Sequence, residues 1–178
     1  MAITIRPAQS TDIDQYTILL QKTYVESYTN DALGLTKDCF SKEIFAHSDT
    51  QDYLKNNLRN TSIQKCWLAF LDSKLIGAIT VRDKGDAYEL TGFYVDSAFQ
   101  GKGVGKQLWK YALTFAKEKD ITLDLYAHNT KAIEMYKRWG FIIDEQRGRF
   151  YRHWQEWPDG LQAACLYMRL KREKLSHV

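Results

Sequence analysis

The segment most able to carry chemistry is residues 100–106, which read Gln-Gly-Lys-Gly-Val-Gly-Lys. It follows a stretch with the apolar content of a strand and precedes apolar residues at helical spacing. A glycine-rich turn at the start of a helix collects unpaired backbone N–H groups, which together bind an anion. Lys102 and Lys106 add positive charge to this turn. The segment therefore predicts a phosphate-binding loop, and the alternative is a tight strand-to-helix turn without a ligand.

The spacing of this loop excludes two common nucleotide-binding motifs. A Walker loop has Gly-x-x-x-x-Gly-Lys-Ser/Thr, whereas here Gln107 follows Lys106. The dinucleotide pattern Gly-x-Gly-x-x-Gly ends on Lys106 when it starts at Gly101, and on Leu108 when it starts at Gly103. The loop therefore predicts neither a nucleoside triphosphate nor a dinucleotide as its ligand.

A second segment with functional side chains is residues 129–141. Asn129 and Tyr136 lie two helical turns apart on one face of a predicted helix, and Ala132 between them leaves room for a ligand. A phenol with a pKa of about 10 stays protonated at neutral pH and can act as a general acid. The alternatives are that Tyr136 is a core aromatic residue and that Asn129 is only a helix N-cap.

The two segments occur in the order that characterises one known family. Gln100, Gly103 and Gly105 fit the pattern Gln/Arg-x-x-Gly-x-Gly/Ala directly after the strand at residues 93–95. This resembles the acetyl-CoA loop of the GNAT superfamily of N-acetyltransferases, and residues 129–141 resemble the second CoA-side helix and strand of that family. The overall pattern is similar to that of bacterial spermine/spermidine acetyltransferases. Residues 1–60 match the family in layout more than in motif.

The resemblance implies acetyl-CoA as co-substrate, with its pyrophosphate on the N–H groups of residues 101–106. The pantetheine arm would lie between two parallel strands that splay apart, residues 89–95 and 121–126. A free amide of the first strand would polarise the thioester carbonyl. Tyr136 would protonate the departing sulfur, and Asn129 would hold the pantetheine. The implied cofactor-binding positions are Phe93, Tyr94, Val95, Gln100, Gly101, Lys102, Gly103, Val104, Gly105, Lys106, Asn129, Ala132 and Tyr136.

Transfer to an amine also requires a route for the ammonium proton. Glu89 precedes Val95 by six residues and is expected on the same side of the strand as Thr91 and Phe93. Some family members recruit a carboxylate base from this position, so Glu89 is a candidate general base acting through water. The alternative is a carboxylate in solvent at the margin of the sheet. No cysteine is placed to form an acyl-enzyme, so we expect direct transfer in a ternary complex.

Length, composition and charge limit the classes of protein to which this chain can belong. The 178 residues, with 44% hydrophobic and 26% charged side chains, predict a single folded domain over residues 1–178. No apolar run approaches the ~20 residues of a membrane helix, and residues 1–7 lack a signal core, so a cytoplasmic protein without a membrane partner is expected. The net charge of +3 argues against nucleic acid. Cysteines and histidines are too scattered for a metal or redox site.

The elements that must position these residues follow from hydrophobic periodicity. Residues 3–6 predict a strand, and residues 13–28 and 36–58 predict two or three short helices, with a restart at Thr50. Strands are expected at 65–71, 74–81 and 87–95, followed by the glycine loop and its helix, a strand at 121–126 and a helix at 129–139 ended by Gly140. Strands at 141–147 and 163–170 complete the order βααβββαβαββ. This is an α/β fold with a central mixed, twisted sheet flanked by helices.

The acceptor is the least constrained part of the prediction. Residues 12–52 carry eight Asp/Glu against three Lys, which is either a solvated face or a surface that attracts a cation. With the resemblance, this favours a small-molecule amine, with a polyamine such as spermidine or spermine first. The alternatives are a protein N-terminus or lysine, an aminoglycoside, or a non-catalytic CoA-binding regulatory module. The loop at 152–160, with Trp154 and Trp157, is a wall of the acceptor site, an aromatic plug or a contact between copies, so a homodimer is left open.

Overall fold

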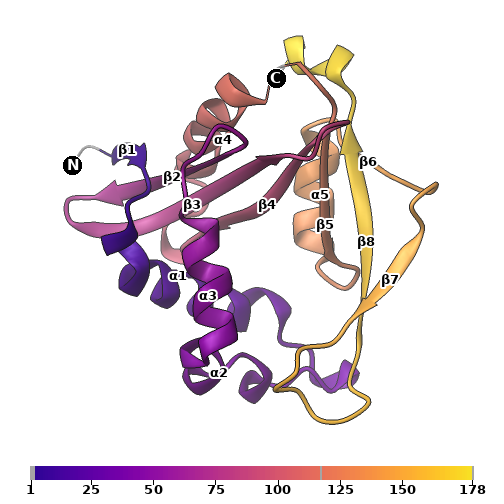
Figure 1. Ribbon diagram of the computed structural model, residues 1–178. Coiled ribbons are helices and arrows are strands. Elements are labelled where there is room, and N and C mark those ends of the chain that lie inside the picture. The colour runs from indigo at the N-terminus through magenta and orange to yellow at the C-terminus, as the bar shows by residue number, and fades with distance from the viewer. Residues whose placement is uncertain (1–2, 117, 178) are drawn as a thin grey trace.

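The computed structural model describes residues 3–116 and 118–177, and it contains a twisted eight-stranded sheet (Figure 1). The strand order is β1-β2-β3-β4-β5-β8-β6, with β7 also pairing with β8, and every pairing is antiparallel except that between β4 and β5. The strands are β1 Ile3–Pro7, β2 Gln64–Leu71, β3 Lys74–Asp83, β4 Tyr88–Val95, β5 Ile121–Tyr126, β6 Ile142–Ile143, β7 Arg149–Arg152 and β8 Ala163–Leu170. The predicted α/β class with a mixed sheet is therefore confirmed.

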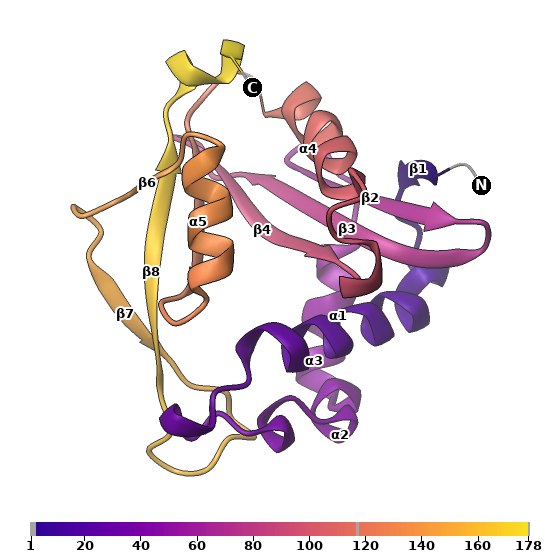
Figure 2. The ribbon, with the colours of Figure 1, turned by 180° about the vertical axis from the view of Figure 1, so that it is seen from behind.

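Helices cover both faces of this sheet, as Figures 1 and 2 show. The α-helices are α1 Ile13–Tyr28, α2 Lys42–Ala46, α3 Ser48–Asn57, α4 Val104–Phe115 and α5 Thr130–Arg138. Short 3-10 turns are η1 Ser10–Asp12, η2 Asp31–Leu33, η3 Lys37–Phe40, η4 Ser97–Phe99 and η5 Arg172–His177. One apolar core lies under α1 and α3, and a second lies under α4 and α5. Burial of two apolar faces of one sheet is what requires helices on both sides.

The element order differs from the predicted βααβββαβαββ at two places. Three helices precede β2, which is the larger of the two numbers expected for residues 13–58, whereas the predicted order counted two. The chain is extended at His47, so α3 restarts at Ser48 rather than at Thr50. The expected strand at 141–147 pairs with β8 only over Ile142–Ile143, since a turn at Asp144 carries the chain away from the sheet. The chain returns as a separate strand, β7, which makes three strands after α5 instead of two.

Strands β4 and β5 diverge soon after they meet. Their parallel register covers only Tyr88 with Ile121 and Glu89 with Thr122, although β4 continues to Val95 and β5 to Tyr126. Over the rest of its length β4 is bonded to β3 on one edge and is not paired with β5 on the other. The divergence therefore opens a gap in the middle of the sheet, where a ligand can contact strand backbone.

A β-bulge in β4 reverses the side to which its residues point. The register places Gly92 opposite Thr80 and Leu90 opposite Val81, which leaves Thr91 as the extra residue. As a result, Phe93 packs in the core under α4 and α5, whereas Tyr94 lies in the core under α1 and α3. The expectation that Glu89 and Phe93 share a side is therefore wrong, because simple alternation does not include the bulge.

Candidate active site

The glycine loop forms an open turn that leads into helix α4. Gly101 and Gly103 have φ values of 73° and 82°, a left-handed conformation that favours glycine, and a Cβ at either position would meet no atom within 4 Å. Within the described chain, the amides of residues 101–103 donate no hydrogen bond. The first-turn amides of α4 also have no partner within the helix. The loop therefore presents a set of free N–H groups to the outside of the molecule, as an anion-binding turn requires.

Gly105 has a different physical role from that of Gly103. A Cβ at Gly105 would lie 3.2 Å from Cζ of Phe93, so the missing side chain allows α4 to approach β4 closely. Gly105 therefore serves the packing of α4 on β4, and its place among the cofactor-binding positions stays a prediction. Gln100 bridges two elements at the same place, since its Nε2 donates to the Val95 carbonyl at 3.1 Å and its Oε1 accepts from Lys131 Nζ at 2.9 Å.

Helix α5 carries the second predicted set of residues. Asn129 is its N-cap, because Asn129 Oδ1 accepts a hydrogen bond from the Ala132 amide at 3.2 Å. Tyr136 is 8% exposed, and its ring packs against Trp139 and Phe141 with centroid separations of 6.3 and 5.3 Å. Burial raises the pKa of the Tyr136 phenol, so the group stays protonated at neutral and mildly alkaline pH.

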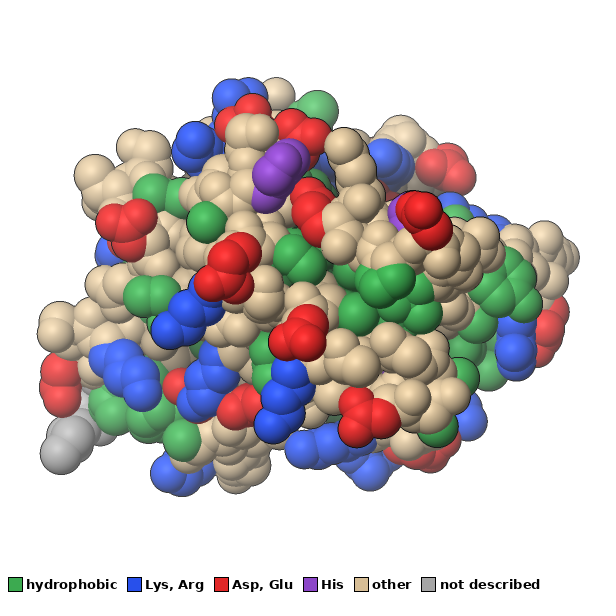
Figure 3. Space-filling model, turned by 90° about the horizontal axis from the view of Figure 1, so that it is seen from below, with side chains coloured by type: hydrophobic (Ala, Val, Ile, Leu, Met, Phe, Trp, Pro, Cys, Tyr) green, Lys and Arg blue, Asp and Glu red, His purple; other side chains and the backbone are tan. Residues whose placement is uncertain are grey.

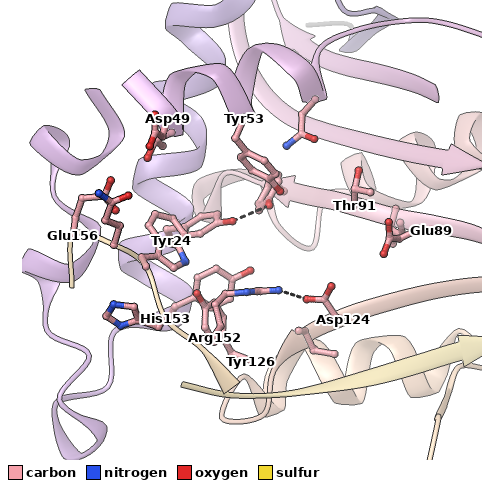
Figure 4. Close-up of a pocket in the computed structure, with 18 of the residues that line it drawn as sticks. Tyr24, Asp49, Tyr53, Glu89, Thr91, Asp124, Tyr126, Arg152, His153 and Glu156 are labelled. Carbon is pink, nitrogen blue, oxygen red and sulfur yellow. Dashed lines mark hydrogen bonds and ion pairs between the residues drawn. The ribbon is translucent and has the colours of Figure 1, made fainter. Parts of the chain in front are cut away.

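A cavity of about 570 Å³ lies across the gap between β4 and β5. Its walls come from elements far apart in the sequence, with α1 and α3 on one side and the segment 152–156 on the other (Figure 4). The residues of β4 and β5 that line it are Glu89, Leu90, Thr91, Tyr94, Asp124, Leu125 and Tyr126. The remaining lining residues are Tyr24, Tyr28, Asp49, Thr50, Tyr53, Asn57, Arg82, Arg152, His153, Trp154, Gln155 and Glu156. Apart from Glu89, the lining residues of β4 and β5 all lie beyond Glu89 and Thr122, the last residues that pair the two strands. The cavity therefore lies beside the gap where β4 and β5 diverge.

The lining of the cavity is acidic on balance. Four carboxylates and two guanidinium groups give it a net charge of −2 with His153 neutral. Arg152 is held by Asp124, with Nη2 and Oδ1 2.5 Å apart, and Arg82 donates to the amide oxygen of Gln64. Asp49 and Glu156 lie toward one end, and Glu89 lies at the other (Figure 4). The cavity can therefore stabilise a cation in two separate regions.

Glu89 lines the cavity from β4 and is neither free in solvent nor deeply buried. Its side chain is 22% exposed, and Oε2 lies 3.6 Å from Lys84 Nζ, which is itself half exposed. The bulge places Glu89 on the same side of the sheet as Tyr94, toward the cavity, whereas Phe93 faces α4. A carboxylate at this position can exchange a proton with a bound amine or water.

Aromatic side chains form most of the remaining wall. The Tyr24 and Tyr94 hydroxyls are 3.2 Å apart, and the Tyr28 and Tyr126 rings are 4.6 Å apart. The hydroxyl of Tyr126 and the Nδ2 of Asn57 are buried at the cavity and form no hydrogen bond with any residue that the structure describes. Such groups stabilise a ligand that supplies the missing partner. Asp124, a charged residue within the mostly apolar strand 121–126, is the sequence signal that could have pointed to the part of this wall that β5 provides.

The acidic segment of residues 12–52 contributes less to the cavity than its sequence suggested. Of its carboxylates only Asp49 lines the cavity. Asp12 is buried against Arg6, and Glu26 accepts a hydrogen bond from Ser97 outside the cavity. Acidic and basic side chains intermingle on the lower face of the molecule (Figure 3). Most of this segment is therefore a solvated or structurally paired surface, which was the alternative reading of its charge.

The loop after β7 serves as both wall and plug. Trp154 lines the cavity, and its ring stacks on that of Trp157 with centroids 5.8 Å apart. Trp157 is buried, and its Nε1 donates to the Cys39 carbonyl at 2.9 Å, which fixes the loop to the N-terminal segment.

The three cysteines are buried free thiols, and the described residues contain no cluster of three or more His, Cys, Asp or Glu able to hold a metal ion. No helix in the described part is long and apolar enough to cross a membrane.

Comparison with known sequences gives one family. Residues 29–141 match the family described as Acetyltransferase (GNAT) family. The chain is 33% identical over 101 residues to the peptidyl-lysine N-acetyltransferase YjaB of Salmonella typhimurium, covering 53% of this chain and 68% of that protein. It is 35% identical to the N-alpha-acetyltransferase RimI of Mycobacterium tuberculosis, covering 36% and 41%, and 38% identical to the spermine/spermidine N(1)-acetyltransferase of Bacillus subtilis, covering 29% and 37%. The matched segments thus span well under half of these last two relatives.

Comparison with solved structures agrees on the fold. The PaiA N-acetyltransferase of Thermoplasma acidophilum, solved in complex with coenzyme A, superposes with a TM-score of 0.68 at 21% identity, covering 96% of this chain and 99% of that one. The ribosomal-protein-S18-alanine N-acetyltransferase of Escherichia coli superposes with a TM-score of 0.65 at 16% identity, covering 96% and 94%. At these identities the superpositions show a shared fold.

Proposed function

Because the chain belongs to the GNAT family of acetyltransferases, we propose that it transfers the acetyl group of acetyl-CoA directly to a primary amine, with a polyamine such as spermidine or spermine as the leading acceptor. Enzymes of this family use acetyl-CoA as co-substrate. The observation that carries the proposal is the acidic cavity beside the gap between β4 and β5. In this proposal the gap takes the thioester end of acetyl-CoA, the cavity takes the amine, and residues 1–178 act as one unit.

The binding of acetyl-CoA is assigned to the glycine loop and to β4. The free amides of residues 101–106 would bind the pyrophosphate, and Lys102 and Lys106 would add charge. Gln100, Val104 and Gly105 shape the turn, while the backbone of Phe93, Tyr94 and Val95 would contact the pantetheine arm. Asn129 and Ala132 face the same arm from α5. These assignments rest on open loop geometry and on the unpaired edge of β4.

The reaction needs a neutral amine, which is scarce at pH 7. An alkylammonium with a pKa near 10.4 is neutral in about one molecule in 2,500, a handicap of roughly 4.6 kcal/mol. We assign Glu89 to accept the ammonium proton, directly or through water. The amine nitrogen then attacks the carbonyl carbon, a C–N bond forms and the C–S bond breaks, and the sulfur takes a proton from Tyr136. On becoming an amide the ammonium nitrogen loses two protons. The first passes through Glu89 to solvent, and the second, lost after the C–N bond forms, replaces the proton that Tyr136 gives to the thiol.

The polyamine assignment is supported by the position of the carboxylates. Asp49 and Glu156 lie at the end of the cavity opposite Glu89, so an acceptor with a second ammonium group would find a partner for each charge (Figure 4). One relative is named for spermine and spermidine. Acetylation of a peptide lysine or N-terminus is the second candidate, because other relatives carry those names and Tyr53, which lines the cavity, is half exposed.

The decisive experiment is thiol release from acetyl-CoA across a panel of polyamines, aminoglycosides, amino acids and peptides. We expect the highest kcat/KM with spermidine or spermine. Preferred turnover of a lysine peptide would replace the polyamine by the second candidate. Tight CoA binding without turnover of any amine would overturn the enzymatic assignment in favour of a CoA-binding regulatory module.

A further inference from the structure

Asp96, the first residue after β4, is a buried carboxylate that has no part in the mechanism above. It is 3% exposed. Its Oδ1 lies 2.7 Å from Lys22 Nζ, and its Oδ2 lies 3.5 Å from Lys74 Nζ. Aspartate is almost never buried unless it is paired, and here two lysines from separate elements provide the pairing. Asp96 therefore joins α1 and β3 at the point where the acetyl-CoA loop begins.

On the side of the loop, Asp96 determines the conformation of the next residues. Its Oδ1 accepts a hydrogen bond from the Ala98 amide at 3.0 Å, and its carbonyl accepts one from the Phe99 amide at 2.8 Å. These two bonds form η4, which ends immediately before Gln100. The ring of Phe99 lies 5.3 Å from the ammonium groups of both Lys74 and Lys102. The path into the glycine loop is thus fixed by contacts that originate at Asp96.

Lys22, the residue paired with Asp96, belongs to a helix that forms part of the cavity wall. Lys22 lies on α1, and Tyr24 and Tyr28 of the same helix line the cavity. One turn beyond Lys22, Glu26 accepts a hydrogen bond from Ser97 Oγ at 3.1 Å. Lys22 and Glu26 of α1 therefore bind two consecutive residues, Asp96 and Ser97, which lead through η4 into the glycine loop.

The charge state of Asp96 supports this arrangement. Burial acts to raise the pKa of Asp96, but hydrogen bonds from Lys22 and the Ala98 amide, together with the two lysine charges, hold the pKa below its ordinary value. Asp96 is therefore ionised at neutral pH. Replacing it with Asn keeps the shape and the bond to the Ala98 amide but removes the charge that holds Lys22.

We infer that Asp96 is a positioning residue that couples the acceptor helix α1 to the acetyl-CoA loop through its ion pair with Lys22. The inference rests on the proposed function, in which residues 101–106 bind the pyrophosphate of acetyl-CoA. When the pair is broken, η4 keeps the hydrogen bond from Ser97 to Glu26 but loses its ion pair with α1, and the free amides of the loop lose their alignment. The affinity for CoA therefore falls. Because coupling between two binding sites is reciprocal, a bound acceptor also changes the affinity for CoA less than it does in the wild type.

The test compares Asp96→Asn and Lys22→Met with a matched buried pair elsewhere. Lys22 is 39% exposed, so its replacement leaves the core intact even where Asp96→Asn fails to fold. The control is Asp12→Asn, because Asp12 is similarly buried and pairs with Arg6 at 2.6 Å at the other end of α1. Calorimetry with CoA, thermal unfolding, and KM and kcat with the best acceptor are measured for each variant.

We expect the Kd for CoA and the KM for acetyl-CoA to rise about 10-fold in Asp96→Asn and several-fold in Lys22→Met, within the 5- to 150-fold range of typical coupling. The kcat at saturating acetyl-CoA should change less than about 2-fold, and Lys22→Arg should restore most of the affinity. Asp12→Asn should lower the melting temperature without changing CoA affinity. Unchanged CoA affinity in Lys22→Met and Asp96→Asn, or an equal loss in Asp12→Asn, would overturn the inference. Because CoA binding is measured without turnover, absence of activity in the wild type would count against the proposed function alone.

Discussion

The hydroxyl groups of Tyr24 and Tyr94 lie 3.2 Å apart and join helix α1 to strand β4 inside the cavity. Burial above all raises the pKa of both phenols, so both are neutral and share a single hydrogen bond. Tyr24 also contacts Trp154 at a ring separation of 5.5 Å, which connects α1 to the loop after β7. Helix α1, strand β4 and the loop after β7, which are distant in the sequence, thus meet in one part of the cavity wall.

Replacing Gly103 with Glu should weaken acetyl-CoA binding by at least 10²-fold, as measured by calorimetry. The residue has a left-handed φ of 82° and opens to empty space, so a side chain and a negative charge would lie where the pyrophosphate is proposed to bind. Each tenfold loss of affinity corresponds to about 1.4 kcal/mol.

The variant Gly148→Glu is the control for the effect of backbone strain alone. Gly148 has a φ of 67°, is equally open, and lies in the turn between β6 and β7. This variant should lose comparable stability but keep its affinity for acetyl-CoA. Equal affinities in the two variants would remove the glycine loop from the binding site.

Replacing Tyr136 with Phe should lower kcat about 10²-fold, or roughly 2.7 kcal/mol of transition-state stabilisation, with little change in acetyl-CoA affinity. Among the described residues the Tyr136 hydroxyl makes no hydrogen bond, so its removal breaks no hydrogen bond within that part of the fold. Because burial raises the pKa of Tyr136, the acid form persists as the pH rises, and kcat should not decline up to about pH 9.5.

Tyr16→Phe is the matched control for this variant. Tyr16 is fully buried in the other core, and within the described part of the chain its hydroxyl likewise makes no hydrogen bond. Its loss should leave kcat unchanged. Wild-type kcat in Tyr136→Phe, measured where chemistry limits the rate, would assign Tyr136 to the core alone.

The parts of the molecule that could be predicted from the sequence are those specified by neighbouring residues. The glycine loop needs left-handed backbone at Gly101 and Gly103, and helix α5 needs a cap at Asn129 and a stop at Gly140, which has a φ of 88°. Each of these signals lies within a few residues of its effect. In the same way, the spacing of apolar residues along the chain predicted most of the strands and helices.

The parts that could not be predicted depend on register between distant strands. The bulge at Thr91 follows from how β3 pairs with β4, and it alone decides that Glu89 and Tyr94 face the cavity. The ion pair of Asp124 with Arg152 joins residues 28 positions apart in the chain. No local pattern specifies either contact, which is why most of the cavity wall was absent from the predicted site.

Replacing Glu89 with Gln should lower kcat/KM for the amine about 10²-fold at pH 7, because the ammonium proton loses its acceptor. The deficit should shrink as the pH approaches 10, where a growing fraction of the amine is already neutral in solution. Steady-state kinetics between pH 7 and 10 measure both effects.

The control for Glu89→Gln is Glu156→Gln, which removes an equal charge from the opposite end of the same cavity. It should raise KM for a polycation but leave the pH dependence of kcat unchanged. Parallel pH profiles for the wild type and Glu89→Gln would mean that Glu89 is not the base.

The attraction of a polyamine should depend on ionic strength. As salt rises to physiological levels the Debye length shrinks to about 8 Å, so the long-range attraction between the acidic cavity and a polycation is screened. We expect kcat/KM for spermidine to fall more steeply with salt than kcat/KM for a short monoamine. Identical slopes for the two amines would exclude charge attraction as the source of acceptor preference.

The carboxylates responsible for that attraction should be those of the cavity and not those of the acidic segment as a whole. The double variant Asp49→Asn and Glu156→Gln removes two charges from the end opposite Glu89, so KM for spermidine should rise about 10-fold while KM for a monoamine changes little. The matched control, Asp31→Asn with Asp38→Asn, removes two exposed charges of the same acidic segment outside the cavity, and it should leave both KM values within about 2-fold. If the control variant raises the spermidine KM as much as the cavity variant does, recognition is a property of overall surface charge, and the cavity has no specific region for a second ammonium group.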